Sequence, residues 1–127
     1  MRAPAVILVV EDDEAGLTLL QAVLEGEGFL VDSAAREEEV LKQLNARRPD
    51  LILMDVQLPG ANGLTITRRL KANPATTAIP IVALTAHAMT GDREQALSAG
   101  CIDYITKPID TRTLADQIRK FLPVTVQ

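Results

Sequence analysis

Continuous apolar runs of strand length recur along this chain. Three of them contain no alternation with polar residues: Val6 to Val10, Leu51 to Met54 and Ile81 to Leu84. A run of this kind is typical of a strand that is buried on both faces of a sheet. Two less regular runs, Phe29 to Ala34 and Ile102 to Thr106, predict two further strands. Asp32 and Ser33 interrupt the first of these, so we expect it near an edge of the sheet.

Between these runs, apolar residues return at helical spacing and predict five helices. The helices are expected over Glu14 to Glu27, Arg36 to Arg48, Gly63 to Asn73, Asp92 to Ala99 and from Asp110 onward. Gly28 and Gly100 follow the first and fourth helices and are typical stop residues, while Pro74 ends the third. In the second helix, Val40 and Leu41 belong to the stripe that is expected to face the core.

Strands that alternate with helices predict an α/β fold. The connections are expected to be right-handed crossovers, which gives a doubly wound, five-stranded parallel sheet with helices on both faces. The pattern shows no repeat and no low-complexity linker, and 127 residues suit one domain, so we expect residues 1–127 to form a single unit. In such sheets, ligands bind outside the carboxyl ends of the strands.

Polar residues stand at four of these expected strand ends. They are Glu11 and Asp12, Asp55, Thr85 and Lys107. Each has an ordinary explanation when taken alone: an acid at position 55 can cap a helix or lie in a solvated loop, and the threonine and lysine can be simple surface residues. Four strand ends that carry reactive or charged groups together predict a shared site at one edge of the sheet.

Three carboxylates at one edge repel one another, so the group favours a bound cation. A small number of oxygen ligands suits Mg²⁺, which keeps several of its waters. An ionised Asp55 can then act as a nucleophile toward phosphorus, while Lys107 and Thr85 contact the oxygens of the transferred group. The sequence therefore predicts phosphoryl transfer to Asp55, and we expect Asp55 alone among the acids to face Lys107 and Thr85.

These residues and their spacing resemble the response-regulator receiver family. The resemblance rests on Glu11-Asp12, Asp55, Thr85-Ala86 and Lys107-Pro108, and it covers nearly the whole chain. It implies a flavodoxin-like strand order of 2-1-3-4-5 and phosphorylation of Asp55 by a histidine kinase or a histidine phosphotransfer protein. It also implies a regulatory domain that supports only its own modification and that acts on a downstream protein target. Residues 84–89 and 100–104 are similar to hybrid-kinase receivers and to single-domain relay regulators of the DivK type.

The same resemblance assigns a metal site. It implies that Asp12 and Asp55 bind Mg²⁺ directly, that Glu11 acts through a water molecule and that Gln57 contributes its backbone carbonyl. Asp13 lies one position beyond the matched acidic pair. We therefore expect Asp13 to be a solvated acid at the start of a helix rather than a ligand.

A conformational switch is also implied by the resemblance. Thr85 and Tyr104 match the family's switch residues, and the implied change moves the Thr85 hydroxyl to a phosphoryl oxygen while Tyr104 rotates inward. The Lys107-Pro108 bond is expected to be cis, on the strength of the family alone. His87 matches a variable position that tunes how fast the phosphate is lost in the family, and it can equally be an ordinary solvent-facing residue.

Composition narrows the classes of partner. A net charge of −4 argues against direct binding to nucleic acid or to an anionic membrane, because both need a basic surface. Cys101 is the only cysteine, which excludes an internal disulfide, favours the cytoplasm and suggests a small buried hydrophobic residue. The first apolar run is too short for the core of a signal peptide, and no run approaches the length of a membrane span.

Three alternatives remain at this point. A phosphatase of the haloacid-dehalogenase type also uses an aspartyl nucleophile, but it needs a second acid two residues later, where this chain has Gln57. A flavodoxin-like nucleotide- or flavin-binding domain needs a phosphate loop after the first strand, where the acids from Glu11 to Glu14 repel phosphate. A receiver that never takes phosphate is the third, although every key position is filled.

Overall fold

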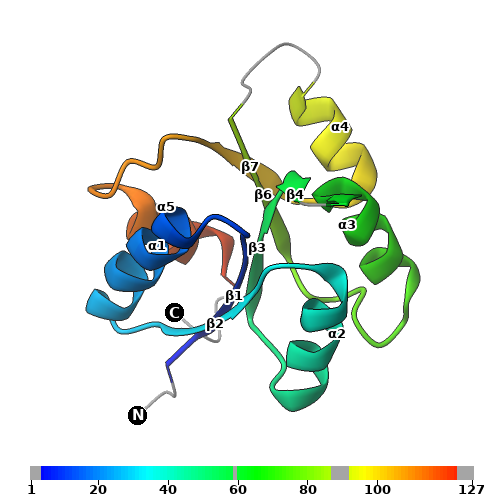
Figure 1. Ribbon diagram of the computed structural model, residues 1–127, viewed down its shortest axis with the longest axis horizontal. Coiled ribbons are helices and arrows are strands. Elements are labelled where there is room, and N and C mark those ends of the chain that lie inside the picture. The colour runs from blue at the N-terminus through cyan, green and yellow to red at the C-terminus, as the bar shows by residue number, and fades with distance from the viewer. Residues whose placement is uncertain (1–3, 59, 87–91, 123–127) are drawn as a thin grey trace.

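The computed structural model describes residues 4–58, 60–86 and 92–122, and its centre is a five-stranded parallel sheet (Figure 1). The strands are β1 (Val6–Val10), β2 (Leu30–Ala34), β3 (Leu51–Asp55), β6 (Ile81–Thr85) and β7 (Asp103–Thr106). Their spatial order is β2-β1-β3-β6-β7, which is the predicted order 2-1-3-4-5 when the long strands are counted along the chain. The edge position of β2 is also as predicted.

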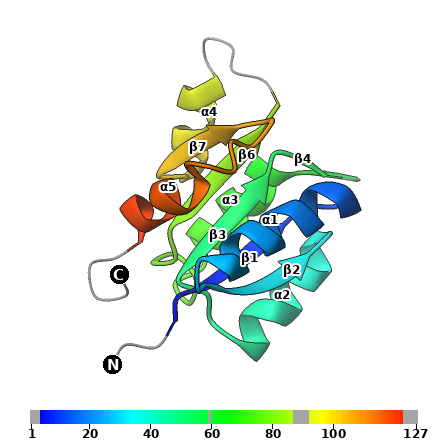
Figure 2. The same ribbon diagram turned by 90° about the vertical axis from the view of Figure 1, so that its left-hand side faces the viewer.

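Five helices cover the two faces of this sheet. They are α1 (Glu14–Gly26), α2 (Glu37–Ala46), α3 (Gly63–Ala72), α4 (Asp92–Ala99) and α5 (Leu114–Phe121). Helices α1 and α5 lie on one face, and α2, α3 and α4 lie on the other (Figure 1). Figure 2 views the molecule from the side of α1 and α5, which stand in front of the sheet. The doubly wound α/β fold is therefore confirmed.

Alternate residues of each central strand feed two separate cores. In β1, Ile7 and Val9 pack with α1 and α5, whereas Leu8 and Val10 pack with the residues of α2, α3 and α4. All four side chains are buried. A strand that serves a core on each face must be apolar at every position, which is why the central strands read as unbroken apolar runs.

The second helix differs from its prediction in its end and in the side that it buries. It ends at Ala46 rather than Arg48, and Leu41 is 49% exposed while Val40 is fully buried. Consecutive residues on a helix are about 100° apart around its axis. Because α2 buries only a narrow stripe that contains Val40, Leu41 turns partly toward solvent. After the helix the backbone becomes extended at Arg47, and the guanidinium of Arg47 pairs with the Asp32 carboxylate at 2.8 Å.

The last helix begins at Leu114, four residues after the predicted start at Asp110. Asp110 forms a turn instead, because its carboxylate accepts a hydrogen bond from the Arg112 backbone N–H at 3.0 Å. Its carbonyl oxygen accepts from the N–H groups of Thr113 and Leu114. An aspartate that bonds its own backbone two residues on is typical of turns as well as helix caps, so the sequence signal was ambiguous.

The sequence pattern also missed a short antiparallel pair, β4 (Gln57–Leu58) and β5 (Ala61–Asn62), which follows β3 directly. The pair lies where turn formers alone were expected. Most other boundaries are as predicted, and the rest differ by one residue. Gly28 and Gly100 have positive φ angles of 92° and 113°, as their predicted role as helix stops requires.

Two expectations from composition can be compared with the structure. Cys101 is 4% exposed and packs in the core beneath α2, α3 and α4, as predicted for a small buried hydrophobic residue. Within the described ranges, none of the helices has the length and apolar character that crossing a bilayer requires.

The buried central strands make a direct prediction about stability. Leu53 is fully buried in β3, so Leu53→Ala should lower the free energy of unfolding by ~2–5 kcal/mol through lost burial and a residual cavity. Leu41→Ala removes the same atoms from a half-exposed position and should change it by less than about 0.5 kcal/mol. Urea unfolding followed by circular dichroism measures both, and equal losses in the two variants would contradict the assigned core.

Candidate functional site

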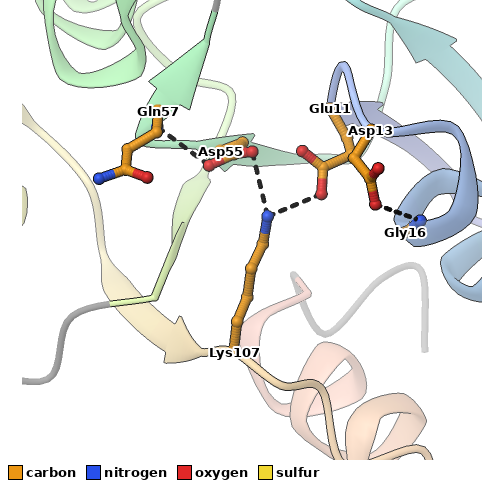
Figure 3. Close-up of polar contacts among 6 residues, drawn as sticks. All are labelled: Glu11, Asp13, Gly16, Asp55, Gln57 and Lys107. Atoms are coloured by element: carbon orange, nitrogen blue, oxygen red, sulfur yellow. Dashed lines mark hydrogen bonds and ion pairs between the residues drawn. The ribbon is translucent and has the colours of Figure 1, made fainter.

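Three charged side chains meet at the carboxyl ends of the strands (Figure 3). Glu11 follows β1, Asp55 ends β3 and Lys107 follows β7. Lys107 Nζ lies 2.7 Å from Glu11 Oε1 and 3.1 Å from Asp55 Oδ2. Both acids are buried, with exposures of 2% for Glu11 and 5% for Asp55. One ammonium group therefore bridges two buried carboxylates.

The strand register explains why these residues meet. β1 and β3 are parallel neighbours that stay in register to their ends, so Glu11 and Asp55, the next residue on each strand, lie side by side. Lys107 arrives from the edge strand β7, and its backbone N–H donates to the Thr85 carbonyl at 2.8 Å. The Lys107-Pro108 bond is cis, as predicted.

The Asp55 carboxylate is held from two sides. Oδ2 accepts from Lys107, and Oδ1 accepts a hydrogen bond from the Gln57 backbone N–H at 3.0 Å. The Gln57 side chain is exposed and points away from Lys107 (Figure 3). The backbone of Gln57, rather than its side chain, is thus the part of this residue that contacts the acid.

Glu11, Asp12 and Asp55 form a cluster that suits a cation. One carboxylate oxygen from each lies within 4.8 Å of the others. Asp12 is exposed to solvent, whereas the other two are buried. Among the described residues, Glu11 Oε2 is a buried oxygen without a hydrogen-bond partner, and such an atom costs free energy unless something satisfies it. The donor set consists of hard oxygens, so these residues fit Mg²⁺.

Crowding of the acids shifts the protonation of Glu11. Burial, together with the hydrogen bond and charge of Asp55, raises the pKa of the Glu11 carboxyl from 4.5 to about 7, although Lys107 opposes the change. Burial lowers the pKa of the Lys107 ammonium, but its hydrogen bonds to Glu11 and Asp55 outweigh this effect and leave that pKa raised. Lys107 is therefore charged at neutral pH, whereas neutral pH lies close to the pKa of the Glu11 carboxyl.

The expectation that Asp55 is the only acid facing Lys107 is wrong, because Glu11 lies closer to the ammonium. A signal for this was present in the sequence. Side chains alternate between the two faces of a strand, so Glu11 is expected on the same face as Ile7 and Val9, which pack against α1 and α5. Lys107 belongs to the connection that leads into α5 on that face.

Asp13 lies beside the site but serves the first helix. It is the N-cap of α1, and its Oδ2 accepts from the Gly16 backbone N–H at 2.8 Å (Figure 3). This is the helix-start role that the sequence predicted for it.

The two residues expected to form a switch border one cavity. Thr85 is buried at the end of β6, and Tyr104 of β7 is partly buried against the core beneath α4. Both line a cavity of about 240 Å³, whose other lining residues are Val56, Leu64, Ala83, Asp92, Gln95 and Ala96. His87 lies outside the described residues.

Comparison with known proteins adds a family to this geometry. The response regulator receiver domain matches residues 7–119 of the chain. The polar-differentiation response regulator DivK of Brucella anthropi is 38% identical over 119 residues, which are 94% of this chain and 97% of that protein. The phosphate regulon transcriptional regulatory protein PhoB of Rhizobium meliloti is 41% identical over 116 residues. Those residues are 91% of this chain and 51% of PhoB, so the chain spans about half the length of that protein.

Solved structures agree with this picture. The receiver domain of the sensor histidine kinase PA1611 from Pseudomonas aeruginosa is 36% identical and superposes with a TM-score of 0.83. The match covers 94% of this chain and 98% of that one. A magnesium ion is coordinated in the active site cleft of that receiver domain.

The raised pKa of Glu11 predicts a pH-dependent stability in protein kept free of divalent metal. Between about pH 4.5 and about pH 7 the unfolded chain has released this proton and the folded chain retains it. The folded state then binds more protons, so the free energy of unfolding falls as pH rises through this window. We expect Glu11→Gln to remove on the order of 2 kcal/mol of that fall.

Urea unfolding in EDTA at pH 5 and pH 8 measures the effect. Glu94→Gln changes an exposed acid of α4 and serves as the control, which should keep the wild-type pH dependence. Glu11→Gln with an undiminished fall between the two pH values would show that the buried acid titrates normally.

Proposed function

The chain belongs to the response regulator receiver family, whose domains are regulatory switches of two-component systems, and from this premise we propose that Asp55 is its phosphoacceptor. The donor is a histidine kinase or a histidine phosphotransfer protein. One observation carries the proposal: a buried Asp55 carboxylate ends β3 with the Lys107 ammonium 3.1 Å from Oδ2. A carboxylate so placed is poised to attack, with a cation ready to meet the charge of the incoming group.

The proposed step transfers one phosphoryl group. A carboxylate oxygen of Asp55 attacks the phosphorus of a phosphohistidine, so that an O–P bond forms while the N–P bond breaks. The electron pair of the broken bond leaves with the imidazole nitrogen, which takes up a proton. Lys107 and Thr85 contact the oxygens of the transferred group, which is how positioning and charge neutralisation promote such reactions.

Mg²⁺ is the cofactor we propose for this site. Asp12 and Asp55 bind it directly, Glu11 acts through water and Gln57 contributes its backbone carbonyl. When bound, the ion neutralises charge on the phosphoryl oxygens. Support comes from the three clustered carboxylates and from the unpaired buried oxygen of Glu11.

For output, we propose that phosphorylation changes a surface that a downstream protein target reads. The Thr85 hydroxyl moves to bond a phosphoryl oxygen, and Tyr104 rotates into the cavity that both residues line. A volume of about 240 Å³ is large enough to take up part of an aromatic side chain, so the rotation needs no unfolding of the core. The face formed by α4, β7 and α5 repacks as a result.

Phosphorylation should be confined to Asp55. Acetyl phosphate with Mg²⁺ should add one phosphoryl group to the wild type, and Asp55→Asn should abolish the labelling because an amide is a poor nucleophile. Intact-protein mass spectrometry gives the readout. Asp116→Asn, at an exposed position of α5, should label like the wild type, whereas undiminished labelling of Asp55→Asn would refute the assignment.

The proposed switch predicts that a Tyr104 variant can keep phosphorylation at Asp55 and lose the change at the surface. Tyr104→Ala should still be labelled at Asp55, but it should lose the backbone amide shifts that phosphorylation causes along α4, β7 and α5 in NMR spectra. Tyr104→Phe keeps the ring and should retain those shifts. Partner affinity, expected to change by roughly 5- to 150-fold in the wild type, should respond in the same way. If Tyr104→Ala shows the same phosphorylation-dependent shifts as the wild type, the switch is wrong and the domain is a passive phosphate carrier.

A further inference from the structure

Gly63 makes the closest backbone approach found beside the acid site. A Cβ atom built on Gly63 would lie 2.0 Å from the carbonyl oxygen of Asp55 and 2.9 Å from its carbonyl carbon. Both atoms are main chain, so rotation of a side chain cannot relieve the clash. The positive-φ glycines are Gly28, Gly60 and Gly100, so position 63 requires glycine for space rather than for backbone conformation.

Local hydrogen bonds hold Gly63 in this position. Its N–H donates to the Val56 carbonyl at 2.8 Å, and the short strands β4 and β5 pair Gln57 with Asn62 just before it. Asn62 then caps α3, because its side-chain oxygen accepts from the Leu64 N–H at 2.8 Å. The chain that leaves β3 is thus closed back on itself, and the first residue of α3 presses on the peptide of Asp55.

The same closed segment orients the phosphoacceptor. The Gln57 N–H that bonds Asp55 Oδ1 at 3.0 Å belongs to β4, inside the loop that Gly63 closes. A side chain at position 63 must push either the Asp55 peptide or the start of α3 outward. Either shift changes where the carboxylate and the Gln57 backbone stand relative to each other.

We propose that Gly63 is a positioning residue for the phosphoacceptor, which sets the Asp55 peptide and thereby the oxygen cluster that binds Mg²⁺. The inference rests on the proposed function, since it concerns the geometry of that same site. Gly63 itself touches neither the metal ligand atoms nor the transferred group in this assignment. It acts through the main chain of Asp55 and through the loop that follows.

Gly63→Ala tests the inference, with Gly26→Ala as the matched control. An added Cβ at Gly26 meets nothing within 4 Å. Titration of the unphosphorylated protein with Mg²⁺ by calorimetry should show affinity reduced by roughly 10- to 100-fold in Gly63→Ala, the range seen when support of a metal site is lost. Gly26→Ala should bind like the wild type. The Gln57 amide, whose bond to Asp55 is disturbed, should exchange its hydrogen faster in Gly63→Ala alone.

The outcomes separate the inference from the proposed function. A wild type without affinity for Mg²⁺ counts against the proposed site, while the Gln57 amide exchange still tests Gly63. A folded Gly63→Ala with wild-type Mg²⁺ affinity and wild-type exchange at Gln57 overturns the inference. Should Gly63→Ala be unfolded, sucrose, which favours the compact state, is added and the titration repeated. A variant unfolded even then makes Gly63 a requirement of the whole fold and overturns its assignment to the site.

Discussion

The ammonium group of Lys107, placed between two buried carboxylates, is the interaction on which the rest of the site depends. Glu11 and Asp55 are forced together by neighbouring parallel strands, and without a cation their charges would repel inside a poorly solvated pocket. Lys107 relieves only part of this, because the pKa of Glu11 stays raised at about 7. Buried ion pairs add little net stability to a fold, because desolvation of the charges offsets their attraction. Binding of a ligand explains this arrangement of charges better than stabilisation of the fold does.

The sheet makes such a site possible by separating two tasks. Every second residue of a central strand enters one of two cores, and the apolar strands are therefore rigid and fully covered. The charged residues of the site, Glu11, Asp55 and Lys107, lie where β1, β3 and β7 end, so their burial does not interrupt either core. A receiver fold can in this way hold reactive groups against a stable framework.

Much of this could be predicted from the sequence, for reasons that particular residues show. Unbroken apolar runs specify doubly covered strands, and strand ends specify which polar residues share an edge, so the sheet and the meeting of Glu11, Asp55 and Lys107 followed from pattern alone. The closer approach of Lys107 to Glu11 than to Asp55 did not, because alternation places both acids on the same face and the distances depend on how far the lysine side chain reaches past β6 and β3. The β4–β5 pair and the late start of α5 were missed since two-residue strands and aspartate turns leave no periodic signal.

Phosphorylation would change the charge balance around Lys107 rather than simply add a label. Conversion of the Asp55 carboxylate into an acyl phosphate would change the local charge from −1 to about −2 and add acceptor oxygens at a place that already holds more carboxylates than ammonium groups. Neighbouring donors must then reorganise, and Thr85 is the buried hydroxyl-bearing residue at the end of the adjacent strand. Thr85 also borders the cavity that Tyr104 lines. If the Thr85 side chain moves to donate a hydrogen bond to the phosphate, the neighbouring Tyr104 ring has room to move into this cavity. In the proposed switch, phosphorylation of Asp55 at one end of the sheet would thereby change the packing beneath α4.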